Sequence, residues 1–94
     1  MVVIMKSTNP YKEIIDNGYI TRVFSIETDS SELVWHRDKQ DRRIIIVSGD
    51  DWYFQFDNEL PFKLNKNDEI LINKNNFHRI IKGTSDLIVN IYFL

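Results

Sequence analysis

The sequence predicts an all-β fold, a sandwich or a barrel built from short strands. Apolar residues recur mainly with a period of two, as they do in strands that have one buried face. Turn signals rich in Asn, Asp, Ser and Gly separate these runs about every 8 to 12 residues, a spacing typical of sandwiches and barrels. With 94 residues, 43% of them hydrophobic and 28% charged, the chain fits a single domain over residues 1–94 with one modest core.

Five runs have the composition and the period of strands. The run "RRIIIVSG" is apolar on both faces, which predicts a strand that is covered on both sides. In "WYFQFD", Trp52, Phe54 and Phe56 share one face and are expected in the core. The five runs are residues 19–26, 42–49, 52–57, 69–73 and 86–94.

The segment before the first run contains the only candidate for a helix. Asn9 could cap one or two helical turns over residues 9–16, with Pro10 at the first helical position. Directly after it, the dipeptide Asn17-Gly18 is a strong signal for a two-residue hairpin turn.

The composition excludes several classes of function. The net charge of −2 leaves no basic field for nucleic acid or for an anionic membrane. Without cysteine there are no disulfides, no thiolate ligands and no thiol nucleophile. The apolar run that opens the sequence is too short for a signal peptide or a bilayer span, so we expect a cytoplasmic protein. The 9 Asn against 3 Gly predict that Asn replaces Gly at turns that need a positive φ.

Two histidines and an aspartate form the candidate site. In a strand, residues i and i+2 point to the same side, so His36 and Asp38 are expected to share a face with Val34. His78 lies in "NNFHRI", another β-favouring stretch that follows a turn. If both strands face the inside of one barrel, the two imidazoles and the carboxylate form a set suited to Fe(II), and also to Mn, Ni or Zn. The alternative is that each histidine is an ordinary surface or hydrogen-bonded residue.

The spacing around the first histidine resembles a known metal motif. His36, Asp38, Arg42 and Gly49 are separated by one, three and six residues. The first motif of the cupins, small double-stranded β-helix (jelly-roll) barrels, runs His, one residue, His, three or four residues, Glu, six residues, Gly. The four residues here fall on that motif in register.

The spacing around the second histidine resembles the second cupin motif. Asn67, Asn73, Asn75 and His78 are separated by five, one and two residues. The cupin motif runs Gly, five residues, Pro, one residue, Gly, two residues, His, so Asn stands at the Gly, Pro and Gly positions. The resemblance covers residues 32–94 and implies a cupin barrel that binds a divalent metal ion and a small molecule, and that forms a homodimer.

The departures from the motifs concern the ligands. Asp38 replaces the second His and is still a competent ligand, whereas Arg42 replaces the Glu and cannot ligate a metal because a guanidinium offers no lone pair. Arg42 could hold an anionic substrate group, pair with Asp38, or face solvent. Gln55, on a central strand, could point into the barrel beside the metal as a further substrate contact, or face solvent.

Three functions are consistent with these residues. The first is a metal-binding cupin with ligands His36, Asp38 and His78 that binds or acts on a small polar or anionic molecule, the metal serving as Lewis acid or oxygen-activating centre if the protein is an enzyme. The second is a non-catalytic binding or sensor module with a metal-free site. The third is a structural dimer with a vestigial site. The fold alone cannot choose, because cupin barrels host many chemistries.

Overall fold

The computed structural model describes residues 10–16 and 18–94 as two antiparallel β-sheets. This part of the chain contains eight strands and one short 3-10 helix. The elements are β1 (Lys12–Asp16), β2 (Tyr19–Phe24), η1 (Ser30–Glu32), β3 (Arg42–Ser48), β4 (Tyr53–Phe56), β5 (Phe62–Lys63), β6 (Glu69–Ile72), β7 (His78–Ile81) and β8 (Leu87–Phe93).

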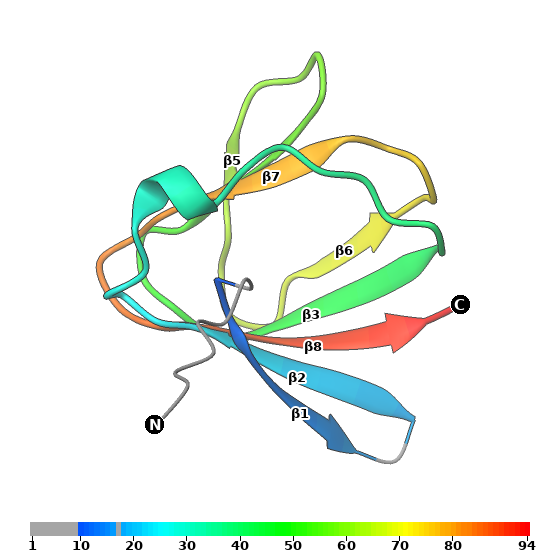
Figure 1. Ribbon diagram of the computed structural model, residues 1–94, viewed down its shortest axis with the longest axis horizontal. Coiled ribbons are helices and arrows are strands. Elements are labelled where there is room, and N and C mark those ends of the chain that lie inside the picture. The colour runs from blue at the N-terminus through cyan, green and yellow to red at the C-terminus, as the bar shows by residue number, and fades with distance from the viewer. Residues whose placement is uncertain (1–9, 17) are drawn as a thin grey trace, which may run out of the picture.

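The two sheets enclose the core between them. The larger sheet has the strand order β1-β2-β8-β3-β6 and the smaller one β5-β4-β7 (Figure 1). Ile46 and Ile91 from the larger sheet and Phe54 from the smaller one are buried in one cluster with Trp52, and Phe56 packs against it. The all-β prediction is therefore confirmed, and so is the core position of Trp52 and Phe54, whereas Phe56 is only half-buried at the edge of the core. No helix in the described ranges is long and apolar enough to cross a membrane.

Each of the five predicted runs contains an observed strand. β2, β3, β4, β6 and β8 all lie within the limits that the apolar period gives. β3 lies between β8 and β6 in the larger sheet, with Ile46 buried in the core. The prediction that β3 is covered on both sides is wrong within this chain, because on its outer face Arg43 is exposed and Ile45 and Val47 are only half-buried. Two elements were not predicted: β5 is too short to show a period, and η1 is a single turn that Asp29 caps by accepting a hydrogen bond from the Ser31 backbone N–H.

The predicted helical turn over residues 9–16 is wrong where the structure describes it. Lys12–Asp16 is strand β1, which pairs along its whole length with β2. Pairing across a tight hairpin overrides a weak local helical preference. The expected cap, Asn9, lies outside the described residues.

The predicted hairpin turn is confirmed by the strand register. Asp16 pairs with Tyr19, so a two-residue loop joins β1 to β2. Gly18 has a φ of 88°, which only glycine adopts readily. Asn17, the other turn residue, lies outside the described residues.

Asparagine takes the role of glycine at three turns in the second half of the chain, those at Asn58, Asn67 and Asn75. Asn67 has a φ of 71° and Asn75 a φ of 64°, both in the left-handed region. These are the two positions at which the second spacing has Asn in place of Gly. The prediction made from composition is thus confirmed at both. The turns set the ends of β6 and deliver the chain into β7.

Candidate metal centre

His36 and Asp38 lie in the loop between η1 and β3. The sequence had predicted that they lie on a strand, and that prediction is wrong. His36 forms a single antiparallel bridge with His78, through backbone N···O distances of 3.0 and 2.9 Å. Strand pairing does not continue because the following run, "RDKQD", offers no apolar residues to bury. The carbonyl of Asp38 is held separately, by the backbone N–H of Asn75 at 2.7 Å.

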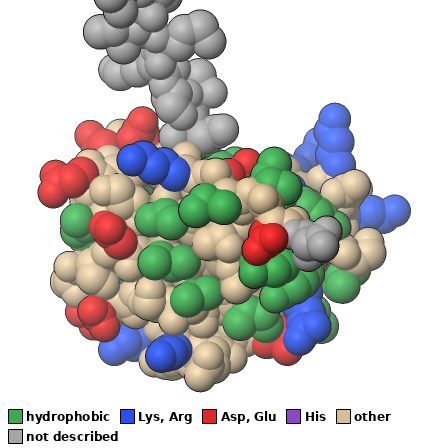
Figure 2. Space-filling view, turned by 90° about the horizontal axis from the view of Figure 1, so that it is seen from below, with side chains coloured by type: hydrophobic (Ala, Val, Ile, Leu, Met, Phe, Trp, Pro, Cys, Tyr) green, Lys and Arg blue, Asp and Glu red, His purple; other side chains and the backbone are tan. Residues whose placement is uncertain are grey.

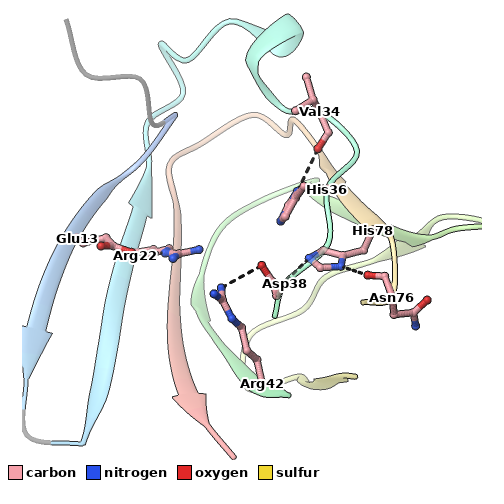
Figure 3. Close-up of polar contacts among 8 residues, drawn as sticks. All are labelled: Glu13, Arg22, Val34, His36, Asp38, Arg42, Asn76 and His78. Atoms are coloured by element: carbon pink, nitrogen blue, oxygen red, sulfur yellow. Dashed lines mark hydrogen bonds and ion pairs between the residues drawn. The ribbon is translucent and has the colours of Figure 1, made fainter. Parts of the chain in front are cut away.

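The three candidate ligands converge despite this difference. A ligand atom of His36, one of Asp38 and one of His78 all lie within 4.8 Å of one another. The two imidazole rings meet edge to face at 4.3 Å between centroids. Figure 3 shows the three side chains pointing into one space, the first two from the loop and His78 from β7.

The ring of His78 is fixed by its surroundings. Its Nδ1 lies 2.8 Å from the carbonyl oxygen of Asn76, which can only accept, so Nδ1 carries the proton. Nε2 therefore directs its lone pair at Asp38, whose Oδ2 is 3.3 Å away. Burial lowers the pKa of His78 below its usual value of 6.5, and His36 and Arg42 act in the same direction, whereas the hydrogen bond to Asn76 and the charge of Asp38 oppose it. A neutral imidazole thus presents an acceptor to a carboxylate acceptor.

His36 shows the same arrangement at the exposed end of the site. Its Nδ1 lies 3.1 Å from the carbonyl oxygen of Val34, which again assigns a proton to Nδ1 and makes Nε2 the nitrogen that can ligate a metal. A backbone carbonyl that holds the second ring nitrogen is the usual support for a histidine that ligates a metal. The difference lies in burial: His36 is exposed, whereas His78 is 4% exposed.

Arg42 pairs with Asp38 without using up its carboxylate. Its Nη1 lies 3.5 Å from Oδ1, while Oδ2 faces His78. The guanidinium also lies 5.2 Å from the ring centroid of Phe93, and its side chain is 16% exposed. Nε of Arg42 is buried and has no hydrogen-bond partner among the described residues. Of the three orientations considered for Arg42, the structure has the pairing with Asp38, on the wall of the cavity.

These polar groups stand at one side of an apolar cavity of about 320 Å³ between the sheets. Apolar residues from both sheets and from the loop line the cavity, among them Val34, Ile44, Ile46, Ile70 and Ile80.

The structure does not bring Gln55 to the site. Its Nε2 donates to the carbonyl of Glu59 at 2.9 Å, and its Oε1 accepts from Nε of Arg79 at 2.8 Å. Alternation along β4 explains this, because Phe54 on the same strand is turned into the cavity. The expected substrate contact therefore lies on the outer side of the smaller sheet.

Sequence reasoning missed a second arginine. Arg22 on β2 lines the cavity, donates from Nε to Glu13 across the hairpin, and lies 4.1 Å from the ring centroid of Tyr11. Figure 3 shows its guanidinium directed toward the space that Asp38 and Arg42 share. The alternation of "YITRVF" was the available signal, since Arg22 has the parity of the apolar Phe24 that also lines the cavity.

Comparisons by sequence find no relatives, since no family model and no curated protein matches the chain. Comparisons by structure find many. A cupin-2 domain containing protein from Shewanella frigidimarina is 20% identical, with a TM-score of 0.64 over 89% of this chain and 79% of that one. A cupin domain from Bordetella pertussis is 16% identical, with a TM-score of 0.60 over 96% of this chain and 98% of that one.

A third similar structure is the Fe(II) form of HppE in complex with substrate. It is 13% identical and has a TM-score of 0.65 over 99% of this chain. This chain spans 57% of its length. The same protein is similar in its Co(II) form with Tris buffer, at 12% identity and a TM-score of 0.65. At these identities the likeness concerns the fold.

Proposed function

Because the chain has the cupin fold, we propose that it is a small metal-binding cupin in which His36, Asp38 and His78 hold a divalent metal ion. The observation that carries this proposal is the contact between Nε2 of His78 and Oδ2 of Asp38 at 3.3 Å. Nε2 of a neutral His78 and Oδ2 of Asp38 are both acceptors, so their contact is favourable only when a proton or a metal ion is shared between them. Burial disfavours a proton on His78, whereas a divalent ion suits both atoms.

The chemistry of the three donors fits such an ion. Two imidazoles and one carboxylate are the ligands that Fe(II) takes in open sites, and Mn, Ni and Zn accept the same groups. Bond lengths of about 2.0 to 2.2 Å place neighbouring ligands about 3 Å apart. The observed 4.8 Å limit is wider, and His36 is the ligand that can close it because it is exposed on a loop.

In this proposal the cavity binds or acts on a small polar or anionic molecule, with Arg42 as its contact. When bound, the metal would supply Lewis acidity or oxygen activation. The second candidate is a binding or sensor protein without turnover. This second candidate is favoured by the two arginines in the wall of the cavity, Arg22 and Arg42, which are paired with carboxylates. A guanidinium stays protonated, so neither arginine can serve as a general base.

Metal content tests the proposal. The purified protein would be loaded without oxygen with Fe(II), Mn, Ni or Zn in turn, and the bound ion per chain measured by elemental analysis. We expect about one ion per chain, lost in His36→Ala, Asp38→Ala and His78→Ala. Arg37→Ala is the matched control, because Arg37 lies between two of the ligands but is exposed, with its guanidinium 5.2 Å from the Phe77 ring centroid. The proposal would be overturned if the protein bound none of the four ions, or if all three ligand variants kept the metal.

We also propose that the protein is a homodimer formed through the outer face of the larger sheet. Figure 2, seen from the side on which β1 and β2 lie in Figure 1, shows several hydrophobic side chains on this face, with one acidic side chain among them and further acidic and basic ones toward the rim. A rim of both signs can match a second copy of itself around a two-fold axis. The outward apolar residues on these strands include Ile14, Val23, Ile45, Leu71 and Ile88.

The oligomeric state tests the homodimer. Light scattering should give twice the chain mass of 11.3 kDa, and Leu71→Lys should halve it. Leu60→Lys is the control, since Leu60 is 87% exposed in the β4–β5 loop, away from that sheet. A monomeric wild type would contradict the dimer and leave the metal site untouched.

A further inference from the structure

We infer that the cavity binds a small acid with an apolar body. The acid and the metal ion each raise the affinity of the protein for the other, because Arg42 stands at the position where a fourth, negatively charged ligand would be. The inference rests on the proposed metal site. It names the class of ligand and a coupling between ligand and ion that the metal site alone does not require.

The first step is a charge balance at the site. A histidine that ligates a metal is neutral, and the single negative charge of Asp38 is already matched by the guanidinium of Arg42, which stands 3.5 Å away. The two charges of a divalent ion would therefore be left without compensation from the cluster. Uncompensated charge beside an apolar cavity is costly, so an anion is favoured there. With a glutamate at position 42, the protein itself would supply the missing negative charge.

The second step concerns the donors of Arg42. One contact at 3.5 Å to Asp38 uses little of a guanidinium that has five N–H donors in a planar fork. Its Nε is buried and without a hydrogen-bond partner among the described residues, and a buried donor left in that state is unfavourable. A carboxylate or phosphonate beside Arg42 can accept hydrogen bonds from the guanidinium in the planar, paired geometry that such groups favour.

The third step concerns the rest of the ligand. Away from the site the walls are apolar and include Phe24, Leu64 and Leu87. The two other charged groups that line the cavity do not call for a second ionic group on the ligand. Arg22 is paired with Glu13 through Nε and is directed toward the same space as Arg42, so it adds to one acid-binding end, and Glu32 is exposed on η1. A single acid group with an uncharged body matches these walls.

The coupling follows from the same charges. If the ion attracts the acid, the acid must strengthen binding of the ion by the same factor, since binding free energies are reciprocal. We expect a factor of about ten or more in each direction, within the usual range for coupled sites.

Calorimetry of ligand binding tests the inference on the full chain. Hexanoate and hexylphosphonate are the acid probes, hexan-1-ol the uncharged probe of the same length, and acetate the acid without a body. Each is titrated into protein loaded with the ion that binds best and into protein stripped of metal. We expect the six-carbon acids to bind the loaded protein at least tenfold more tightly than hexan-1-ol or acetate do, and at least tenfold more tightly than they bind the stripped protein. Whichever of the two acid probes binds more tightly identifies the acid group.

Two variants test Arg42, and the first gives opposite results for ion and acid, which loss of folding cannot do. Arg42→Glu should bind the ion at least tenfold more tightly and lose the binding of hexanoate. Arg42→Gln, which adds no charge, should weaken hexanoate about tenfold or more in the loaded protein. Arg43→Gln is the matched control, because Arg43 is the next residue but faces outward and pairs with Glu69 at 2.9 Å, and it should bind hexanoate as the wild type does.

The results separate this inference from the metal site beneath it. A loaded protein that binds hexan-1-ol as tightly as hexanoate, or acetate as tightly as hexanoate, overturns the ligand class and leaves the metal site standing. Unchanged hexanoate binding in Arg42→Gln overturns the role of Arg42, and equal affinity for acid with and without metal overturns the coupling. A chain that loads no ion overturns both proposals.

Discussion

The two halves of the candidate site differ in how firmly the fold holds them. His78 opens strand β7, is buried, and stacks on Phe54 with 5.4 Å between ring centroids. His36 is exposed in a loop and joins the sheet through one bridge. A ligand on a packed strand is placed before any ion arrives, whereas a ligand on a loop can still adjust. The site therefore combines a fixed half with an adjustable one.

The fixed half also positions the adjustable one. Asp38 and His36 are tied by their backbones to Asn75 and His78, and Oδ1 of Asp41 accepts from the backbone N–H of Lys74 at 2.7 Å. Every one of these partners belongs to the turn that enters β7 or to its first residue. The loop that carries His36 and Asp38 thus takes its shape from the segment that carries His78. A substitution in the His78 segment should therefore disturb the loop more than a substitution in the loop disturbs the His78 segment.

The largest expected difference between the halves is in stability. His78→Ala leaves a cavity against Phe54 and removes the hydrogen bond to the Asn76 carbonyl, so the free energy of unfolding should fall by about 2 to 3 kcal/mol. His36→Ala should change it by no more than about 0.5 kcal/mol, because the side chain is exposed. Urea unfolding with a chelator present measures both without a contribution from bound metal. Equal losses would mean that the loop is as rigid a part of the fold as β7.

The sequence predicted the fixed half better than the adjustable one. Alternation between a core and an outer face marks β6 and β8, and a continuous apolar run marks β3. The prediction that Asn67 and Asn75 replace glycine at turns before His78 was also confirmed, since asparagine tolerates the positive φ that both turns require. These features depend on local chemistry that a single sequence carries.

The loop half depends on partners that are distant in the sequence. Strand periodicity was assigned to His36 and Asp38, yet a polar run ends the pairing after one bridge, and the contacts that then hold the loop come from residues 74–78. Arg22 was missed for a related reason. Its ion pair with Glu13 exists only because residues 12–16 form a strand of the hairpin, where the sequence had predicted a helical turn.

The next largest effect should come from the turns that enter the fixed half. Asn67→Ala and Asn75→Ala should each lower the free energy of unfolding by about 1 kcal/mol, since alanine is disfavoured at a φ of 71° or 64°. The corresponding glycine variants should lose nothing. Asn73→Ala is the matched control, because Asn73 belongs to the same turn as Asn75 but does not have a positive φ. Urea unfolding of the five variants provides the comparison, and glycine variants as unstable as the alanine ones would show that the asparagine side chains matter, not the backbone angle.

The smallest effect should come from the tie between the halves. Asp41→Ala removes the acceptor of the Lys74 backbone N–H, an exposed bond, so it should cost about 0.5 to 1 kcal/mol of stability. Asp41→Asn keeps an oxygen acceptor and should cost less, and exposed Asp57→Ala, in another loop, serves as the control. Metal affinity is the more telling measurement. Because Asp41 acts on the ligands only through the loop, its loss should weaken metal binding by less than about tenfold, below the usual effect of a residue that contacts a ligand directly. An affinity unchanged in Asp41→Ala would mean that the backbone contacts of His36 and Asp38 suffice to shape the loop.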